Sequence, residues 1–234
     1  MALEILKPEW GAGRSIRGVL FDMDGLVLDS EVLFARFWRE AAQCFGFPMT
    51  QEQALGMRSL SKEAGQAQLI SYFGPAASYS AIRAKRIALM DAFVAEHGVQ
   101  PKPGIHQLLD QLHTRGIRSA ITSSSPPERI REYLTPLDLY SRFDKICSGY
   151  DVSHGKPAPD IYLLGAAELG LSPSECLALE DSPAGILSAY RAGCLPVMIP
   201  DLDQPGEETL PLLYAKADSL SEIPSLLDAK TRMP

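Results

Sequence analysis

The sequence predicts an α/β fold of three layers (α, β, α), in which helices cover both faces of a parallel sheet and an all-helical domain is inserted. Three observations support this. From residue 105 onward, strand-like apolar runs alternate with helix-like runs, as in parallel sheets. The apolar run 18–21 is typical of one more buried strand. Between these parts, residues 30–98 show helical spacing and no convincing strand.

The first part of the chain supplies one strand and then helices. We expect strand 17–22, followed by three helices over 31–42, 62–72 and 79–97. Ser30 and Glu31 are typical of a helix start, and glycines or prolines follow each helix. No segment between these helices has the alternation of a strand.

The second part alternates regularly. Four helices are expected over 105–115, 127–134, 158–169 and 183–192. Four strands are expected over 117–122, 144–147, 176–180 and 195–199. Because strand 17–22 should join the same sheet, residues 1–29 and 100–234 form the predicted core and residues 30–99 the inserted domain. Residues 1–15 and 200–216 carry no pattern that predicts an element.

Composition narrows the class of protein. The chain of 234 residues is 46% hydrophobic and 22% charged, as in ordinary globular proteins. A net charge of -7 disfavours nucleic acid and anionic membranes as partners, and no run is long enough for a membrane span. The four cysteines are scattered, so we expect buried, reduced thiols. We therefore expect a cytoplasmic protein without a signal peptide, and a monomer.

Two carboxylates follow the first predicted strand. In extended backbone, Asp22 and Asp24 share one face, and Gly25 allows a sharp turn directly after them. Two acids at a strand end suit a hard cation plus a nucleophile, although an acidic turn is the ordinary alternative. A calcium loop is disfavoured because Leu26 and Val27 stand where further oxygen ligands should come.

Three more strand ends carry chemically useful side chains. The hydroxyl run 122–125 precedes a helix, Lys156 stands in Gly-Lys-Pro-Ala-Pro-Asp, and Glu180 with Asp181 ends a further strand. Each has an ordinary alternative, such as a helix cap or a solvated loop lysine. In open α/β sheets, however, ligands bind at the carboxyl ends of the strands. Together the four ends would hold Mg²⁺ between acids and a phosphate beside lysine and hydroxyls.

These motifs, in this order, resemble the haloacid dehalogenase-like hydrolase superfamily, in particular its β-phosphoglucomutase-like branch with a helical cap on a Rossmann-like core. The resemblance spans about residues 17–227. It implies that Asp22 is the nucleophile and Asp24 the general acid/base. The implied ligands of Mg²⁺ are Asp22, Asp24, Glu180 and Asp181. The implied phosphate-binding residues are Thr122, Ser123, Ser124 and Lys156; spacing leaves open whether Thr122 or Ser123 is the key hydroxyl, with Ser123 fitting slightly better.

The resemblance implies a Mg²⁺-dependent phosphatase for a small phosphorylated metabolite, with a sugar phosphate expected. Mutases of the branch carry a histidine in the first cap helix, whereas this chain has Phe34 there and no histidine before His97. Hydrolysis is therefore favoured over the alternative, a sugar-phosphate mutase. A non-catalytic phosphometabolite-binding protein is a further alternative. Glu31 and Arg58 are candidate substrate contacts from the inserted domain.

Overall fold

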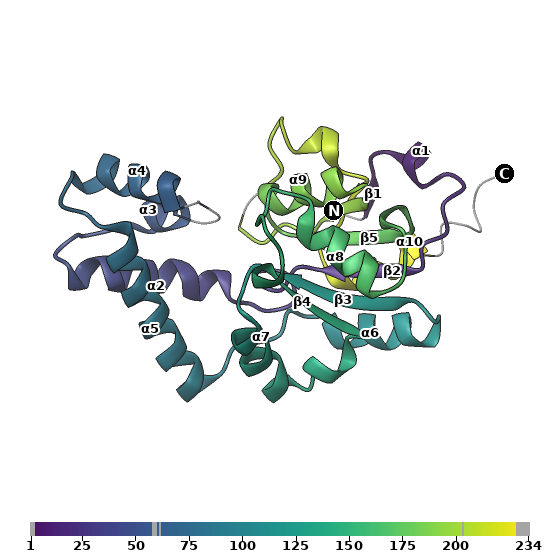
Figure 1. Ribbon diagram of the computed structural model, residues 1–234, viewed down its shortest axis with the longest axis horizontal. Coiled ribbons are helices and arrows are strands. Elements are labelled where there is room, and N and C mark those ends of the chain that lie inside the picture. Colours follow the sequence, from purple (N-terminus) through teal and green to yellow (C-terminus); the bar gives the residue numbers. More distant parts are fainter. Residues whose placement is uncertain (1–2, 58–59, 61, 203, 228–234) are drawn as a thin grey trace. The chain divides into compact units, whose positions relative to one another are not determined.

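The computed structural model describes residues 3–57, 60, 62–202 and 204–227. The chain divides into two compact units (Figure 1). Unit 1 comprises Met1–Leu28 and Gln100–Pro234, and unit 2 comprises Asp29–Val99. Each unit has its own buried apolar core, so each is described by itself.

Unit 1 contains a seven-stranded sheet of order β1-β7-β6-β5-β2-β3-β4. Its strands are β1 (Glu4–Ile5), β2 (Gly18–Phe21), β3 (Arg118–Ser123), β4 (Lys145–Ser148), β5 (Cys176–Glu180), β6 (Leu195–Met198) and β7 (Ala215–Lys216). The strands β2 to β7 pair in parallel, and β1 pairs antiparallel with β7 at one edge. The predicted parallel α/β sheet is thereby confirmed, with one antiparallel edge strand in addition.

Helices cover the sheet of unit 1 on both faces (Figure 1). The helices of this unit are α1 (Pro8–Gly11), α6 (Ile105–Thr114), α7 (Pro127–Leu134), α8 (Asp160–Glu168), α9 (Pro183–Ala192) and α10 (Pro224–Leu227), of which α6 to α9 pack on the strands. Leu20 of β2 packs in one cluster with Tyr162 of α8 and Ala189 of α9. Since neighbouring strand residues point to opposite faces, Phe21 lies on the other face, where its ring meets Phe143 edge-on. The central strand β2 is thus buried on both sides.

Helices joined by loops make up unit 2, and no strand occurs among its described residues. It contains α2 (Glu31–Cys44), α3 (Gln51–Leu55), α4 (Lys62–Phe73) and α5 (Tyr79–His97). Trp38, Leu69 and Ile82, from three of these helices, are buried in one cluster. The three predicted helices are present in this unit. A further short helix, α3, begins with a capping box, in which the side chains of Thr50 and Gln53 each accept a hydrogen bond from the other residue's backbone amide.

The differences from prediction are local. The short elements β1, α1, β7 and α10 were not expected, because two to four residues give no readable periodicity and each depends on tertiary partners. All four cysteines are free thiols, but Cys44, the last residue of α2, is exposed rather than buried as expected. Among the described residues, no helix combines the length and apolar character that a membrane crossing requires.

Candidate active site

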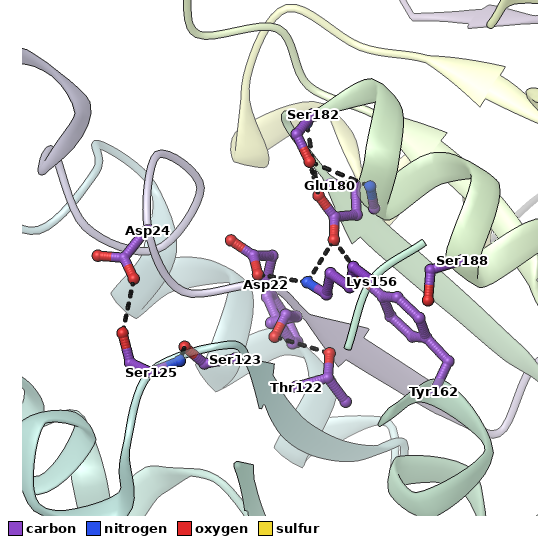
Figure 2. Close-up of polar contacts among 12 residues, drawn as sticks. Asp22, Asp24, Thr122, Ser123, Ser125, Lys156, Tyr162, Glu180, Ser182 and Ser188 are labelled. Carbon is purple, nitrogen blue, oxygen red and sulfur yellow. Dashed lines mark hydrogen bonds and ion pairs between the residues drawn. The ribbon is translucent and has the colours of Figure 1, made fainter. Parts of the chain in front are cut away.

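The carboxyl ends of β2, β3 and β5 bring most of the predicted site residues together in unit 1 (Figure 2). Asp22 follows β2, Ser123 ends β3 and Glu180 ends β5. Because β2 lies between β3 and β5, Asp22 stands between the hydroxyl run and the acidic pair. This placement follows from strand order, which no local pattern of the sequence contains.

The chain turns sharply directly after Asp24. The Asp22 amide still donates to Leu179 O of β5 at 3.0 Å, so Asp22 is held by the sheet. Gly25 then has φ +83°, a left-handed conformation that favours glycine. The Leu28 and Val27 amides donate back to Met23 O at 2.9 and 3.0 Å, closing a compact loop. The predicted turn at Gly25 is therefore present.

Lys156 lies between two carboxylates. Its Nζ donates to Asp22 Oδ1 at 2.5 Å and to Glu180 Oε1 at 2.5 Å (Figure 2). The exposed fractions of the Lys156, Asp22 and Glu180 side chains are 9%, 12% and 1%, so the three residues form a buried cluster. The lysine sits in the loop between β4 and α8, and its peptide bond to Pro157 is cis. A solvated surface lysine is excluded.

Burial and charge both act on this cluster. Burial raises the pKa of Asp22 to about 8, because the ammonium of Lys156 opposes this only in part and Glu180 adds like charge. Burial also lowers the pKa of Lys156, but the Asp22 and Glu180 carboxylates outweigh this effect, so its pKa lies above the ordinary value. The lysine therefore stays cationic.

Both members of the acidic pair at the end of β5 are buried. Glu180 Oε2 accepts from the Ser182 amide at 3.4 Å and from Ser182 Oγ at 3.1 Å, at the start of α9. Asp181 is 6% exposed. Asp22, Glu180 and Asp181 each offer one oxygen, and these atoms lie within 4.8 Å of one another. Carboxylate oxygens in such a group are the ligands that Mg²⁺ prefers; the residues present therefore fit the predicted cation.

Asp24 faces the hydroxyl run instead of the acidic pair. Its Oδ2 accepts from Ser125 Oγ at 3.2 Å, and Figure 2 shows it on the opposite side of Asp22 from Glu180. Its side chain is not among the three carboxylates that converge. The role of Asp24 as a metal ligand stays a prediction.

The hydroxyl run itself is not uniform. Thr122 is fully buried and donates to Phe21 O at 3.1 Å, which ties β3 to β2. Ser123 is also buried, and its Oγ accepts from the Ser125 amide at 3.1 Å. Ser124 is exposed. Thr122 thus donates its O–H to a backbone carbonyl, whereas Ser123 accepts from a backbone amide, and which of the two binds phosphate stays a prediction.

The predicted contacts from the inserted domain lie in unit 2. Glu31 is the first residue of α2 and is half-buried. Phe34, one turn on, has the guanidinium of Arg86 4.6 Å from its ring centroid. Arg58 lies outside the described residues. The roles of Glu31 and Arg58 in substrate binding stay predictions.

Three neighbours of the predicted residues were missed. Tyr162 of α8 donates to Glu180 Oε1 at 2.5 Å, Ser182 holds the other oxygen, and Ser125 holds Asp24. Ser125 could have been found, because it ends the hydroxyl run. In the sequence, Tyr162 occupies an ordinary apolar position of a helix and Ser182 an ordinary helix-cap position. Neither pattern therefore predicts a contact with Glu180.

The fold and this site define an α/β protein with a buried cluster of Asp22, Lys156 and Glu180 at the carboxyl edge of its sheet. The chain belongs to the haloacid dehalogenase-like hydrolase family, whose model matches residues 19–199. It is 36% identical over 184 residues to hexitol phosphatase A of Escherichia coli K12, covering 76% of this chain and 80% of the relative. The resemblance predicted from the motifs is thus confirmed.

Two further relatives bear on the chemistry. A β-phosphoglucomutase of Bacillus subtilis is 29% identical over 190 residues, which cover 78% of this chain and 82% of the mutase. The crystal structure of CbbY from Rhodobacter sphaeroides in complex with phosphate has a TM-score of 0.72 and 26% identity, covering 89% of this chain and 96% of that chain. Relatives named as phosphatases and as mutases therefore both match this chain in sequence.

Proposed function

We propose that this chain is a Mg²⁺-dependent phosphatase that hydrolyses a small phosphorylated metabolite of the sugar-phosphate class through an aspartyl-phosphate on Asp22. The observation that carries the proposal is the buried ammonium of Lys156, held 2.5 Å from Asp22 Oδ1. A phosphoryl group that replaces this contact would meet the nucleophile and the neutralising cation together. The names of the hexitol phosphatase and the phosphoglucomutase support the substrate class.

Asp22 would act first. Its ionised carboxylate, the form that a cation bound beside Asp22 would favour, attacks phosphorus through one oxygen, the bond from phosphorus to the substrate oxygen breaks, and an acyl phosphate forms on Asp22. Asp24 gives its proton to the departing alkoxide. Lys156 and Ser123 hold the phosphoryl oxygens during both steps. This covalent route divides one high barrier into two lower ones.

Asp24 would then act as the base. It takes a proton from water, the resulting hydroxide attacks phosphorus, and the acyl phosphate opens to inorganic phosphate and free Asp22. Asp22, Glu180 and Asp181 would hold Mg²⁺, with Asp24 as a further candidate ligand. When bound there, the cation neutralises charge on the phosphoryl oxygens and so reduces their repulsion toward Asp22.

Hydrolysis is favoured over the mutase reaction by the residue on α2. Phe34 offers no acid/base group, and its ring is packed beside the Arg86 guanidinium. We propose that unit 2 serves as the cap and contributes substrate contacts, with Glu31 and Arg58 as candidates. Discrimination among phosphorylated metabolites would then depend on unit 2, since unit 1 supplies the phosphate chemistry.

The test is a single substitution. In Asp22→Asn, release of inorganic phosphate from an aryl phosphate in Mg²⁺ should fall by about three orders of magnitude or more, because the amide cannot form the acyl phosphate. Asp138→Asn is the matched control, because Asp138 is exposed and has φ 54°, a conformation that asparagine tolerates.

Two results would contradict the proposal. One is phosphate release by Asp22→Asn at the rate of the Asp138→Asn control. The other is unchanged activity of the unmodified protein after EDTA treatment, since removal of Mg²⁺ should stop the reaction and its return should restore it. Interconversion of sugar-phosphate isomers without net phosphate release would favour the mutase instead.

A further inference from the structure

Tyr162 is a fully buried residue whose hydroxyl points into the polar cluster. It lies on α8 among Leu20, Ala166 and Ala178, a cluster in which phenylalanine would fill the same space. Its Oη donates to Glu180 Oε1 at 2.5 Å. The hydroxyl therefore has a specific partner in the site.

Both carboxylate oxygens of Glu180 accept hydrogen bonds. Oε1 accepts from Lys156 and Tyr162, and Oε2 accepts from the amide and hydroxyl of Ser182. A Cβ on Gly185 of α9 would come within 1.9 Å of the Glu180 carboxyl carbon, so the carboxylate rests directly against the helix backbone. Glu180 is thus a rigid acceptor with little freedom to follow the lysine.

Lys156 needs such an acceptor because its other partner is the nucleophile. A lysine side chain has several rotatable bonds and loses about 2 kcal/mol of rotamer entropy when fixed. During attack, Asp22 must turn from the ammonium toward phosphorus, whereas the contact with Glu180 can persist. The Tyr162 ring also approaches the ammonium, with Nζ 5.2 Å from the ring centroid. Tyr162 therefore touches both the lysine and its anchor.

We propose that Tyr162 is a positioning residue for phosphate binding: its hydroxyl and ring keep Glu180 and the Lys156 ammonium in the geometry that receives a phosphoryl group beside Asp22. This inference rests on the proposed phosphatase function for its kinetic consequence. Its structural consequence, binding of inorganic phosphate, can be measured whether or not the chain turns over a substrate.

The experiment removes one oxygen atom. Tyr162→Phe keeps the ring and deletes the hydroxyl. The control is Tyr214→Phe, because Tyr214 is also buried in unit 1 and its described hydrogen bonds involve no residue of the site. Binding of inorganic phosphate in Mg²⁺ is followed by calorimetry. The Lys156 ammonium is observed in protein labelled with ¹⁵N-lysine, and its Nζ resonance is assigned by its loss in Lys156→Met.

Tyr162→Phe should raise the phosphate dissociation constant about tenfold, because Glu180 then has one donor fewer and draws the ammonium toward itself. The Lys156 Nζ resonance should broaden or shift, whereas Tyr214→Phe should match the unmodified protein in both respects. With an aryl phosphate, KM should rise about tenfold and kcat should change less than threefold, since the lysine binds ground state and transition state alike.

Three results would overturn the inference: unchanged phosphate affinity in Tyr162→Phe, weaker affinity with an unchanged Nζ resonance, or loss of cooperative folding, which would assign the hydroxyl to stability alone. If the unmodified protein hydrolyses no phosphorylated compound, the proposed function fails, but the binding and resonance measurements still decide the role of Tyr162.

Discussion

Ser125 distinguishes the two aspartates at the level of single residues. Its hydroxyl donates to Asp24 Oδ2 at 3.2 Å, whereas Asp22 is held by Lys156. Hydrogen bonds to a charged group contribute about 1.5–3 kcal/mol, enough to keep one carboxylate orientation in preference to others. The two acids of one short motif are therefore directed to different partners, in keeping with different chemical roles.

We expect Ser125→Ala to slow turnover about three- to tenfold for a sugar phosphate and much less for p-nitrophenyl phosphate. The reason is that an alkoxide leaving group needs a proton from Asp24, whereas p-nitrophenolate departs without one. The measurement is the ratio of kcat/KM for the two substrates. An equal loss for both would contradict a role of Ser125 in orienting the acid.

Gly185 matters at the level of the element that carries it. It lies in the first turn of α9, where Ser182 caps the helix by accepting from the Gly185 amide at 3.1 Å. The same turn receives the Glu180 carboxylate, which leaves no room for a side chain. The first turn of α9 therefore both starts the helix and holds the Glu180 carboxylate. A change in this turn would move Glu180 and, with it, the Lys156 ammonium that Glu180 binds.

Gly185→Ala should lower kcat/KM at least tenfold and destabilise the fold by about 1–3 kcal/mol, because the added methyl group must displace the carboxylate. Gly206→Ala is the matched control, since nothing lies within 4 Å of a Cβ built there. Kinetics and urea unfolding check both quantities. Gly185→Ala with control-like values in both would show that the carboxylate can move at little cost.

Elements with clear periodicity or apolar runs could be predicted, and those made by pairing could not. The run 18–21 is apolar on both faces, and the structure buries all of β2. By contrast, β1 and β7 are two residues each; β1 pairs with β7, and β7 pairs with β6 as well. Short strands of this kind depend on tertiary contacts that local patterns do not encode.

At the level of the whole molecule, the raised pKa of Asp22 makes the folded chain less stable as pH rises. The Asp22 carboxyl has a pKa of about 8 in the folded chain and about 3.8 when exposed, so the folded state binds its proton more tightly. Between these values the unfolded chain has released this proton while the folded chain retains it. The contribution of Asp22 to stability is therefore present below pH 4 and is lost as pH rises toward 8.

The expected consequence is that Asp22→Asn gains stability relative to the unmodified chain as pH rises from 5 to 8, by more than about 1 kcal/mol. Urea unfolding in EDTA at several pH values measures the difference. Added Mg²⁺ should reduce the trend, because a cation beside Asp22 favours its charged form. A difference that does not change with pH would show that Asp22 is already ionised in the folded chain.

Local sequence patterns specify which chemical groups the site contains and their order along the chain: Asp22, the hydroxyl run, Lys156 and the acidic pair at the end of β5. Strand ends and helix starts are local features, so they can be read from runs and spacings of a few residues. The tertiary structure alone decided which groups meet, because strand order places β2 between β3 and β5. It also selected Tyr162, Ser182 and Ser125 as supports, since contacts between residues far apart in the chain arise from packing and leave no mark in any single segment.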